Sequence, residues 1–407
     1  MHCESALTKR IRRQIRGRVL DFFAATAPGL EEICLGELRL LPLSVKEMRI
    51  VKGGVEFRGR LHDCYLANLH LRTANRILMR LGECRAEGFA QLEKKVKALP
   101  WELWLHPGCI PDFSIRTSRC RLYHTEAIRE RVERSIRERM SAMEKDAETL
   151  QVPADGIHGD KGVSQRIFIR GIRDVFHFSI DSSGEHLHKR GIKAFGADAP
   201  LRETNAAALL LIAGYDSREP LLDPMCGSGT FAIEAAMMAL RIAPGLFRDF
   251  AFRGWPSFQP GRWRHLRREA QEQRIAPGAI PNIFASDADE KACLAAEQNT
   301  VRSPVAGMTD ISQADFFSFS PAQRTGQTGL TVLNPPYGLR MGTDVQSAQL
   351  YPAICHHLAK VYKGWKIALV CPNKKEVEKF PFDWNSRPFF HGGLKLTLMC
   401  GKVPRSL

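Results

Sequence analysis

Residues 221–230, LLDPMCGSGT, decide the fold of the second half of this chain. The two leucines suit a buried strand, and the glycine-rich turn after them opens an apolar helical pattern. Gly227 and Gly229 carry no side chains that would block a ligand at the start of that helix. The turn lacks the Lys and Ser/Thr of a phosphate-binding loop and departs from the GxGxxG spacing of dinucleotide folds. Asp223 would repel a pyrophosphate, so the turn predicts a nucleotide-like cofactor that carries a positive charge.

The residues around this turn alternate between strand and helix patterns. Helical patterns cover 203–213, 230–241, 290–299 and 346–362, and strand patterns cover 221–222, 283–286, 330–333 and 367–371. This alternation is typical of βαβ units and predicts a mostly parallel sheet covered on both faces. Gly392 and Gly393 separate two apolar runs near the end of the chain, which predicts a closing antiparallel hairpin.

Two more acidic residues follow strands of the predicted sheet. Asp287 comes at the end of NIFASD, where a carboxylate can accept both hydroxyls of a ribose. Asp315 follows the next strand, and it offers with Phe316 an acceptor and an apolar surface to a purine ring. Each acid alone is typical of a helix cap or a turn. Together with Asp223 they fall at the carboxyl ends of strands, where open α/β sheets bind ligands.

A proline-rich turn, LNPPYG at 333–338, follows the strand 330–333. Pro335 and Pro336 remove two backbone donors and stiffen the turn, leaving the Asn334 side-chain oxygen and the Pro335 carbonyl as acceptors. The N–H groups of an exocyclic amine would satisfy both acceptors, and Tyr337 can stack on the base. An ordinary Pro-rich turn is the alternative for the motif alone. Its place after three strand-end motifs favours a site for a target base.

Composition and charge narrow the class of protein. The chain has 407 residues, 44% hydrophobic and 25% charged, which excludes disordered and fibrous proteins and predicts two or three domains. Its net charge of +15 favours nucleic acid as a partner, with a basic surface that only promotes solubility as the alternative. The 11 scattered cysteines form no CxxC pair, and no apolar run reaches membrane-spanning length. We therefore expect a cytoplasmic protein without membrane or metal, and a transit peptide at the Arg-rich start is the alternative.

The first half of the chain has an α+β pattern. Strand patterns cover 19–25, 55–58 and 113–117, helical patterns cover 61–71 and 124–143, another helix follows Pro28, and 165–180 predicts a hairpin that turns at Arg173 and Asp174. In the helix 124–143, Ile128, Val132 and Ile136 share one face, and the arginines alternate with glutamates. This predicts a solvated, salt-bridged surface, with RNA contact as the alternative.

Two further segments contain candidate binding residues. Residues 261–274, GRWRHLRREAQEQR, combine Trp263 with five arginines, which suits either an RNA contact or a solvated basic helix. His356 and His357 are adjacent in a helical pattern and point to different faces, so they do not predict a shared metal.

The order and spacing of these motifs resemble a known enzyme class. DPMCGSGT, the acid of ASDAD, ADFF and NPPYG resemble the S-adenosylmethionine and target-base motifs of class I amino-methyltransferases. HLHKRG at 186–191 and RIAPGLFRDFAFRGW at 241–255 are similar to segments of the bacterial 23S rRNA guanine-N2 methyltransferases of the RlmL type. FSIRTSRCRLYHTEAIRERV at 113–132 is similar to their THUMP module.

The resemblance implies an α/β fold, a domain plan and a reaction. It places a ferredoxin-like module at 1–90, a THUMP RNA-binding domain at 91–185 and a class I Rossmann-like methyltransferase domain at 186–407. The implied cofactor is S-adenosyl-L-methionine, and the implied partner is RNA, 23S rRNA either naked or in a ribosome assembly intermediate. A guanosine would be flipped from its stack and methylated on N2. Some relatives carry a second catalytic domain, and no dual activity is expected here.

The resemblance also assigns the site. It places the cofactor against Thr204, Asp223, Pro224, Cys226, Gly227, Gly229, Asp287, Ala288, Asp315, Phe316 and Asn334. Within this set, Asp223, Cys226 and Gly227 would line the methionine and ribose portion, Thr204 would lie near the methionine end, Asp287 would hold the ribose, and Asp315 with Phe316 would hold the adenine. The catalytic turn, Asn334, Pro335, Pro336 and Tyr337, would present guanine N2 to the sulfonium methyl.

Three other functions compete with this interpretation. A tRNA guanine-N2 methyltransferase with the same architecture is the nearest, and the segments 186–191 and 241–255 favour rRNA over it. A DNA adenine-N6 methyltransferase shares the NPPY turn, but the expected RNA-binding half argues against it. A non-catalytic RNA-binding protein would be expected to have degraded cofactor motifs, whereas each motif is intact here.

Overall fold

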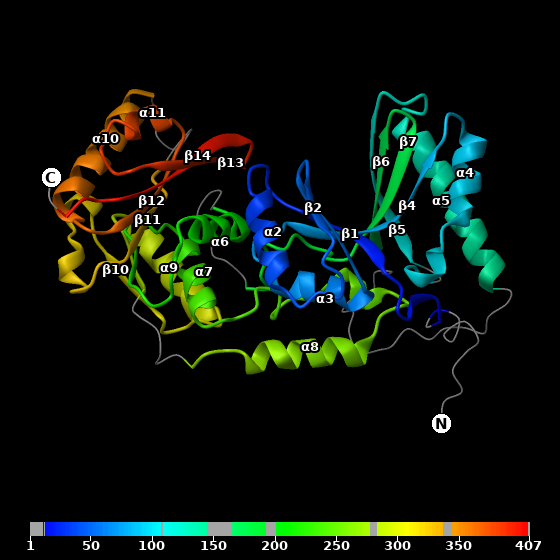
Figure 1. The fold of residues 1–407 in the computed structure, drawn as a ribbon, viewed down its shortest axis with the longest axis horizontal. Helices are drawn as coiled ribbons and strands as arrows, with labels where there is room; N and C mark the ends of the chain where they lie inside the picture. Colours follow the sequence, from blue (N-terminus) through cyan, green and yellow to red (C-terminus); the bar gives the residue numbers. More distant parts are fainter. Residues whose placement is uncertain are drawn as a thin grey trace.

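Two seven-stranded sheets form the framework of this computed structural model (Figure 1). The structure describes residues 11–405 except 12, 107–108, 145–163, 193–200, 277–282 and 337–343. The first sheet uses strands from residues 20–181 and the second uses strands from residues 221–402. None of the described helices is long and apolar enough to cross a membrane.

The first sheet has the strand order β2-β3-β1-β4-β7-β6-β5. Its strands are β1 (Leu20–Ala25), β2 (Met48–Val51), β3 (Gly54–Gly59), β4 (Arg76–Arg85), β5 (Ile110–Ser118), β6 (Ser164–Ile172) and β7 (Val175–Asp181). β4 pairs with β1 on one side and with β7 on the other, so one sheet continues past residue 90. Positive φ angles at Arg173 and Asp174 confirm the predicted turn between β6 and β7. We retain the division at 90 and 185 as a proposal about domains within this sheet.

Four helices pack on the first sheet: α2 (Glu31–Leu40), α3 (Leu61–His70), α4 (Phe89–Ala98) and α5 (Thr125–Glu144). The expected apolar stripe of α5 is confirmed, because Ile128, Val132 and Ile136 are buried in the core. Its arginines form ion pairs; Arg131 and Arg134, for example, lie 3.1 and 2.5 Å from one carboxylate of Glu93. The structure therefore supports the salt-bridged surface rather than RNA contact at this helix.

The second sheet has the order β10-β9-β8-β11-β12-β14-β13. Its strands are β8 (Leu221–Asp223), β9 (Ile283–Asp287), β10 (Thr309–Gln313), β11 (Leu330–Leu333), β12 (Lys366–Cys371), β13 (Asn385–His391) and β14 (Leu394–Lys402). The first five are parallel and the last two form the predicted antiparallel hairpin. α6 (Glu203–Ile212), α7 (Thr230–Ala239), α9 (Glu290–Arg302) and α10 (Asp344–Val361) confirm the predicted alternation. The strand order reverses between β8 and β11, where such sheets bind ligands.

The helix α8 (Pro260–Glu272) connects the two halves along one edge of the molecule (Figure 1). Trp263 is only 5% exposed and packs edge-on against Tyr65 of α3 and against Phe250 and Phe252. The interpretation of Trp263 as a stacking surface for RNA is therefore wrong, because the indole belongs to the core. The arginines around it are exposed, as expected of a basic helix.

Buried polar contacts fix the second half of the chain on the first half. Arg190, in the segment that leads from β7 toward α6, donates to the Glu234 carboxylate at 2.9 Å and to the Arg72 carbonyl at 2.8 Å. Arg72 in turn donates to the Ile242 carbonyl at 2.6 Å. A buried charge is tolerated only when it is paired, so these contacts tie the two halves together.

Glu203, at the start of α6, makes the stability of this junction depend on pH. Burial, together with the nearby Glu234, raises the pKa of Glu203 to about 7, and Arg190 opposes this rise. A carboxyl with a raised native pKa stabilises the fold below its unfolded pKa, and that stability is lost as the pH rises through 7. Glu203→Gln should therefore be more stable than the parent chain at pH 8 by about 2 kcal/mol and nearly equal at pH 5.

Thermal unfolding measured from pH 5 to pH 8 tests this expectation, and Glu272→Gln on the exposed end of α8 is the matched control. A parallel pH profile for the parent chain and Glu203→Gln would contradict it.

Candidate active site

Asp223, the last residue of β8, is buried at the carboxyl edge of the second sheet. It is 1% exposed, and among the described residues neither carboxylate oxygen has a hydrogen-bond partner of good geometry. Burial and the charge of Asp287 raise the pKa of Asp223 well above its usual value, although the Met225 amide is close enough to lower it slightly. A buried, unsatisfied carboxylate is costly, and a bound cation would offset that cost.

The glycine turn leaves room for a ligand beside this carboxylate. Gly227 has a φ of 53°, its Cβ position is open, and its N–H donates to Asp287 Oδ2 at 2.9 Å. Gly229 has a φ of 81°, and a Cβ there would lie 3.1 Å from the Ala296 side chain, so Gly229 serves close packing of α7 against α9. The Cys226 amide donates to the Ser286 carbonyl at 2.9 Å and joins the turn to the end of β9.

Cys226 and Pro224 contribute to the shape of the site and supply no reactive group. The Cys226 side chain is buried, and burial together with Asp223 raises the pKa of its thiol, so the thiol stays protonated. Pro224 lines a small pocket beside Asp223. No described residue pattern indicates a nucleophilic thiolate at this turn.

Asp287, at the end of β9, faces the glycine turn. Its Oδ2 accepts the Gly227 N–H, and its Oδ1 accepts the Asp289 N–H at 3.0 Å. Each carboxylate oxygen has a second lone pair, so two acceptor sites remain for ribose hydroxyls. Ala288 is exposed, and its carbonyl accepts from the Gln313 side chain at 3.1 Å, which fixes the loop after β9 against β10.

Asp315 and Phe316, the two residues predicted to hold the adenine, differ in their exposure. Asp315 is exposed and accepts from the Ser318 hydroxyl at 3.0 Å. Phe316 is 2% exposed, in an aromatic cluster with His357 and Tyr362, so little of its ring is open to an adenine. Phe317, which the sequence analysis did not single out, is 42% exposed and stands edge-on to Phe316.

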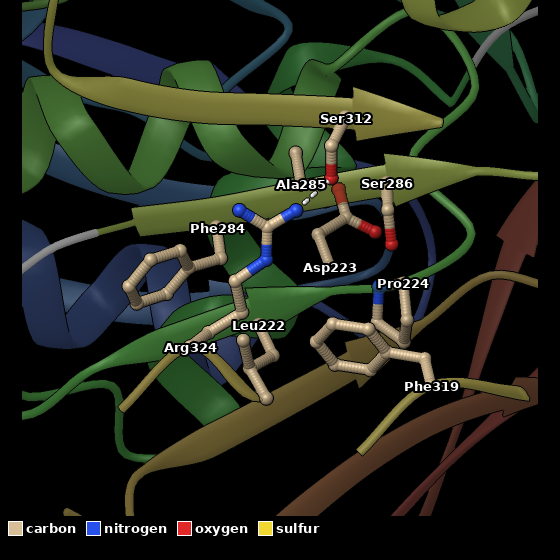
Figure 2. Close-up of a pocket in the computed structure, with 9 residues that line it drawn as sticks. All are labelled: Leu222, Asp223, Pro224, Phe284, Ala285, Ser286, Ser312, Phe319 and Arg324. Carbon is tan, nitrogen blue, oxygen red and sulfur yellow. Dashed lines mark hydrogen bonds between the residues drawn. The ribbon is translucent and has the colours of Figure 1, made fainter. Parts of the chain in front are cut away.

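Figure 2 shows a small pocket formed beside Asp223 by residues of β8, β9 and β10 and by Phe319 and Arg324. The Arg324 guanidinium hydrogen-bonds to Ser312 and pairs with Asp310 at 3.0 Å. Sequence reasoning missed Arg324, because it lies in a segment without a motif and reaches the sheet only through the tertiary fold. Because Arg324 pairs with Asp310, it does not supply the positive charge that Asp223 lacks.

Asn334 and Pro335 follow β11, the parallel neighbour of β8. Asn334 is half-buried, and its Oδ1 is buried with no hydrogen-bond partner among the described residues. Pro335 is buried and Pro336 is exposed; Tyr337 lies outside the described residues. The carboxyl ends of β8 and β11 lie at the same edge of the sheet. Asp223 and Asn334, whose side-chain oxygens have no hydrogen-bond partner among the described residues, are therefore on one side of the sheet.

Thr204 is buried, whereas its predicted position near the methionine end of the cofactor suggests an open environment. It is fully buried in α6, and its hydroxyl donates to the Asn75 side chain at 3.0 Å. Asn75 belongs to the first half of the chain, directly before β4. Contact of Thr204 with the methionine end of a cofactor remains a prediction, and the described contact links this helix to the other half.

The arrangement of the second sheet agrees with comparisons to known proteins. A family model for the RMKL-like methyltransferase domain matches residues 190–398, and a model for the RlmL ferredoxin-like domain matches residues 21–78. The chain belongs to the RMKL-like methyltransferase family. The expected resemblance and fold class are thus confirmed for this methyltransferase, and S-adenosyl-L-methionine is its cofactor.

Individual relatives of the methyltransferase extend over most of its length. It is 34% identical over 369 residues to the Ribosomal RNA large subunit methyltransferase K/L of Allochromatium vinosum, covering 86% of this chain and 47% of that protein. The chain thus spans about half the length of the curated K/L relatives it matches. A solved structure of the candidate methyltransferase SMU.472 with SAH has a TM-score of 0.84 and 29% identity, over 96% of this chain and 100% of the other.

A second solved structure carries a different description. It comes from Listeria monocytogenes, is described as a predicted N6-adenine-specific DNA methylase, and has a TM-score of 0.83 with 27% identity, over 97% of this chain and 98% of the other. The descriptions of both structures name methyl transfer, and only that of the Listeria structure names a substrate.

The residues of this methyltransferase fit its cofactor. A sulfonium and an α-amino group are cations, and the buried Asp223 carboxyl, which has no cationic partner among the described residues, would be ionised by binding one. The open Cβ position at Gly227 leaves room for a ligand, and Asp287 keeps acceptor sites for a ribose. Among the described residues, no cluster of metal-ligating side chains was found.

Proposed function

We propose that this methyltransferase transfers a methyl group to the exocyclic N2 of a guanosine in 23S rRNA, after that base has left its stack. The observation that carries the proposal is that Asn334 Oδ1 is buried without a described hydrogen-bond partner. It lies at the same edge of the sheet as the Asp223 carboxyl group, which also has no described partner. The first oxygen suits an N–H donor, and the second suits a cation. The names of the K/L relatives support ribosomal RNA as the substrate.

The chain's own groups act by positioning. S-adenosyl-L-methionine supplies, when bound, a methyl group on a positively charged sulfur. Asn334 Oδ1 and the Pro335 carbonyl would accept the two N2 protons, which turns the nitrogen lone pair out of conjugation and toward the methyl group. Asp223 would stabilise the positive charge before transfer. The methylated nitrogen then gives up one proton through its hydrogen bond to Asn334 or Pro335, both neutral acceptors, to water.

Tyr337 completes the proposed base site from outside the described residues. Its ring would stack on the face of the flipped base while Pro336 stiffens the turn. Asp315 would hold the adenine amino group, with Phe316 or the exposed Phe317 against the ring. Thr204, held by Asn75, would fix the start of α6 near the methionine end.

A DNA adenine-N6 methyltransferase is the second candidate function. The description of the Listeria structure favours it, and an adenine amino group would satisfy the same two acceptors. The net charge of +15 suits either nucleic acid. A tRNA guanine remains the third candidate, and the cytoplasm remains the predicted location for both RNA substrates.

Nucleoside mass spectrometry separates these functions. Large-subunit rRNA, tRNA and genomic DNA are isolated from cells with and without the gene, and each is analysed for N2-methylguanosine and N6-methyladenine. We expect loss of N2-methylguanosine from large-subunit rRNA alone. Loss from tRNA would keep the chemistry and overturn the substrate, and loss of N6-methyladenine from DNA would overturn both.

A further inference from the structure

The first sheet has one face that its own helices do not cover. In β6 the buried residues Ile167 and Ile169 point toward the core that contains α5, and Arg166, Phe168 and Arg170 point the other way. The same alternation continues through the pairing of β5, β6, β7, β4 and β1. Figure 1 shows α4 and α5 on one side of β6 and β7, with the other side turned toward β1 and β2. We call this uncovered side the open face.

Arginines gather on the open face without enough carboxylates to pair with them. Arg116 of β5 lies directly beside Arg170 of β6 in the strand register, and His177 of β7 follows on the other side of Arg170. Both arginines are exposed, and neither has a carboxylate within ion-pairing distance among the described residues. Like charges directly opposite each other destabilise a sheet. A negatively charged ligand between the two arginines would offset this repulsion.

Aromatic rings lie on the same face next to other arginines. The Arg80 guanidinium lies 4.8 Å from the centre of the Phe23 ring, and Arg76 lies 5.8 Å from that of Phe168. Both rings are half-buried, so part of each remains open. Bases of an unpaired nucleic acid strand stack on such rings, whereas a paired duplex hides its base faces.

The open face is also concave. A groove of about 930 Å³ is lined by β1, β2 and β3 on one side and by residues of β6 and β7, including Arg170 and His177, on the other. Phe23 and Arg80 lie in its lining. The acidic residues of its lining are already paired: Glu56 contacts Arg49 and Arg80, Glu83 contacts His177, and Asp21 and Glu47 both contact Arg58. Among the described residues, the positive charges of the lining without a carboxylate partner are those of Lys46, Lys52 and Arg170.

We propose that this open face binds an unpaired strand of the RNA substrate, with Arg116 and Arg170 on phosphates and Phe23 and Phe168 under bases. The inference rests on the proposed function and deepens it, because it separates a strand-binding surface on the first sheet from the single-base site on the second. Arginine suits both contacts, since its planar group pairs with phosphate and stacks on rings.

Replacing two arginines tests the surface. The double variant Arg116→Gln/Arg170→Gln is compared with Arg129→Gln/Arg137→Gln, which removes the same charge from exposed ion pairs on α5, away from the open face. The probe is a fluorescein-labelled oligouridine of about 12 nucleotides. Its binding to the 407-residue chain is measured by fluorescence anisotropy between about 50 and 200 mM salt, beside that of a hairpin of matched length. Cofactor affinity and methylation of 23S rRNA are measured on the same proteins.

The open-face variant should bind oligouridine about tenfold more weakly than the parent. The slope of the logarithm of affinity against the logarithm of salt concentration should become shallower by about 1.4, because two phosphate contacts are lost. The α5 variant should change affinity less than about twofold. KM for RNA should rise while kcat and cofactor affinity stay unchanged. If the double variant loses cofactor affinity, the single variant Arg170→Gln replaces it in the same test. The salt dependence of its RNA affinity should become shallower by about 0.7.

Equal losses in the two double variants would overturn the proposal, because they would show a general effect of charge. Tighter binding of the hairpin than of oligouridine by the parent would also overturn it in favour of a duplex. Unchanged RNA binding in the open-face variant, in a parent that methylates 23S rRNA, would overturn only this surface. A parent that methylates no RNA would instead overturn the proposed function.

Discussion

Asn334→Ala is expected to lower the rate of methyl transfer at least about a hundredfold while cofactor affinity stays within a factor of about two. The side-chain oxygen that alanine removes is already buried without a described partner, so its loss leaves no other group unsatisfied. The variant should therefore fold normally and fail only when the target amine must be oriented. Single-turnover methylation and isothermal titration with the cofactor measure the two quantities.

Asn373→Ala is the matched control for this variant. Asn373 lies in the same half of the chain, and its side chain accepts from the Lys375 amide at 3.1 Å as the cap of the short helix α11 (Lys374–Val377). We expect a stability cost of about 1 kcal/mol and unchanged methyl transfer. Full activity in Asn334→Ala, or equal loss in both variants, would remove the role that we give to the turn.

Asp223→Asn should weaken cofactor binding at least about a hundredfold, because an uncompensated buried charge on the ligand costs about 3 kcal/mol or more. Without cofactor the same variant should unfold at a higher temperature than the parent, since it removes a buried carboxylate that has no described partner. These opposite signs distinguish a ligand-binding carboxylate from a structural one. Thermal unfolding with and without cofactor gives both values.

Cofactor binding should also release a proton at Asp223. Burial and Asp287 hold the pKa of Asp223 well above its usual value in the free protein, and a bound cation favours the ionised form. The affinity should therefore increase with pH until the pH exceeds that raised pKa. Titration calorimetry in two buffers of different ionisation enthalpy counts the released protons.

Asp216→Asn is the control for both measurements on Asp223. Asp216 is in the same half of the chain and forms an exposed pair with Arg218. It should leave affinity, unfolding temperature and proton release nearly unchanged. Proton release that persists in Asp223→Asn would assign the titration to another group and contradict our account of this carboxylate.

The sequence alone determined the second sheet and the order of its ligand-binding turns. Strand and helix patterns alternate there with short connections, and local patterns of this kind predict parallel βαβ units directly. Asp223, Asp287 and Asn334 could be placed at strand ends for the same reason. The turn at Arg173 and Asp174 and the apolar stripe of α5 were also predictable, because both depend on residues close together in the chain.

Which of these side chains are free to act depends on contacts between residues far apart in the chain. Trp263 has the composition of an RNA contact, but Tyr65, far away in the sequence, encloses it. Phe316 is buried and its neighbour Phe317 is exposed, which the sequence FF does not distinguish. Arg116 and Arg170 are adjacent only because β5 and β6 pair in a particular register. Burial, exclusion of partners and strand register are properties of long-range packing, and no local pattern carries them.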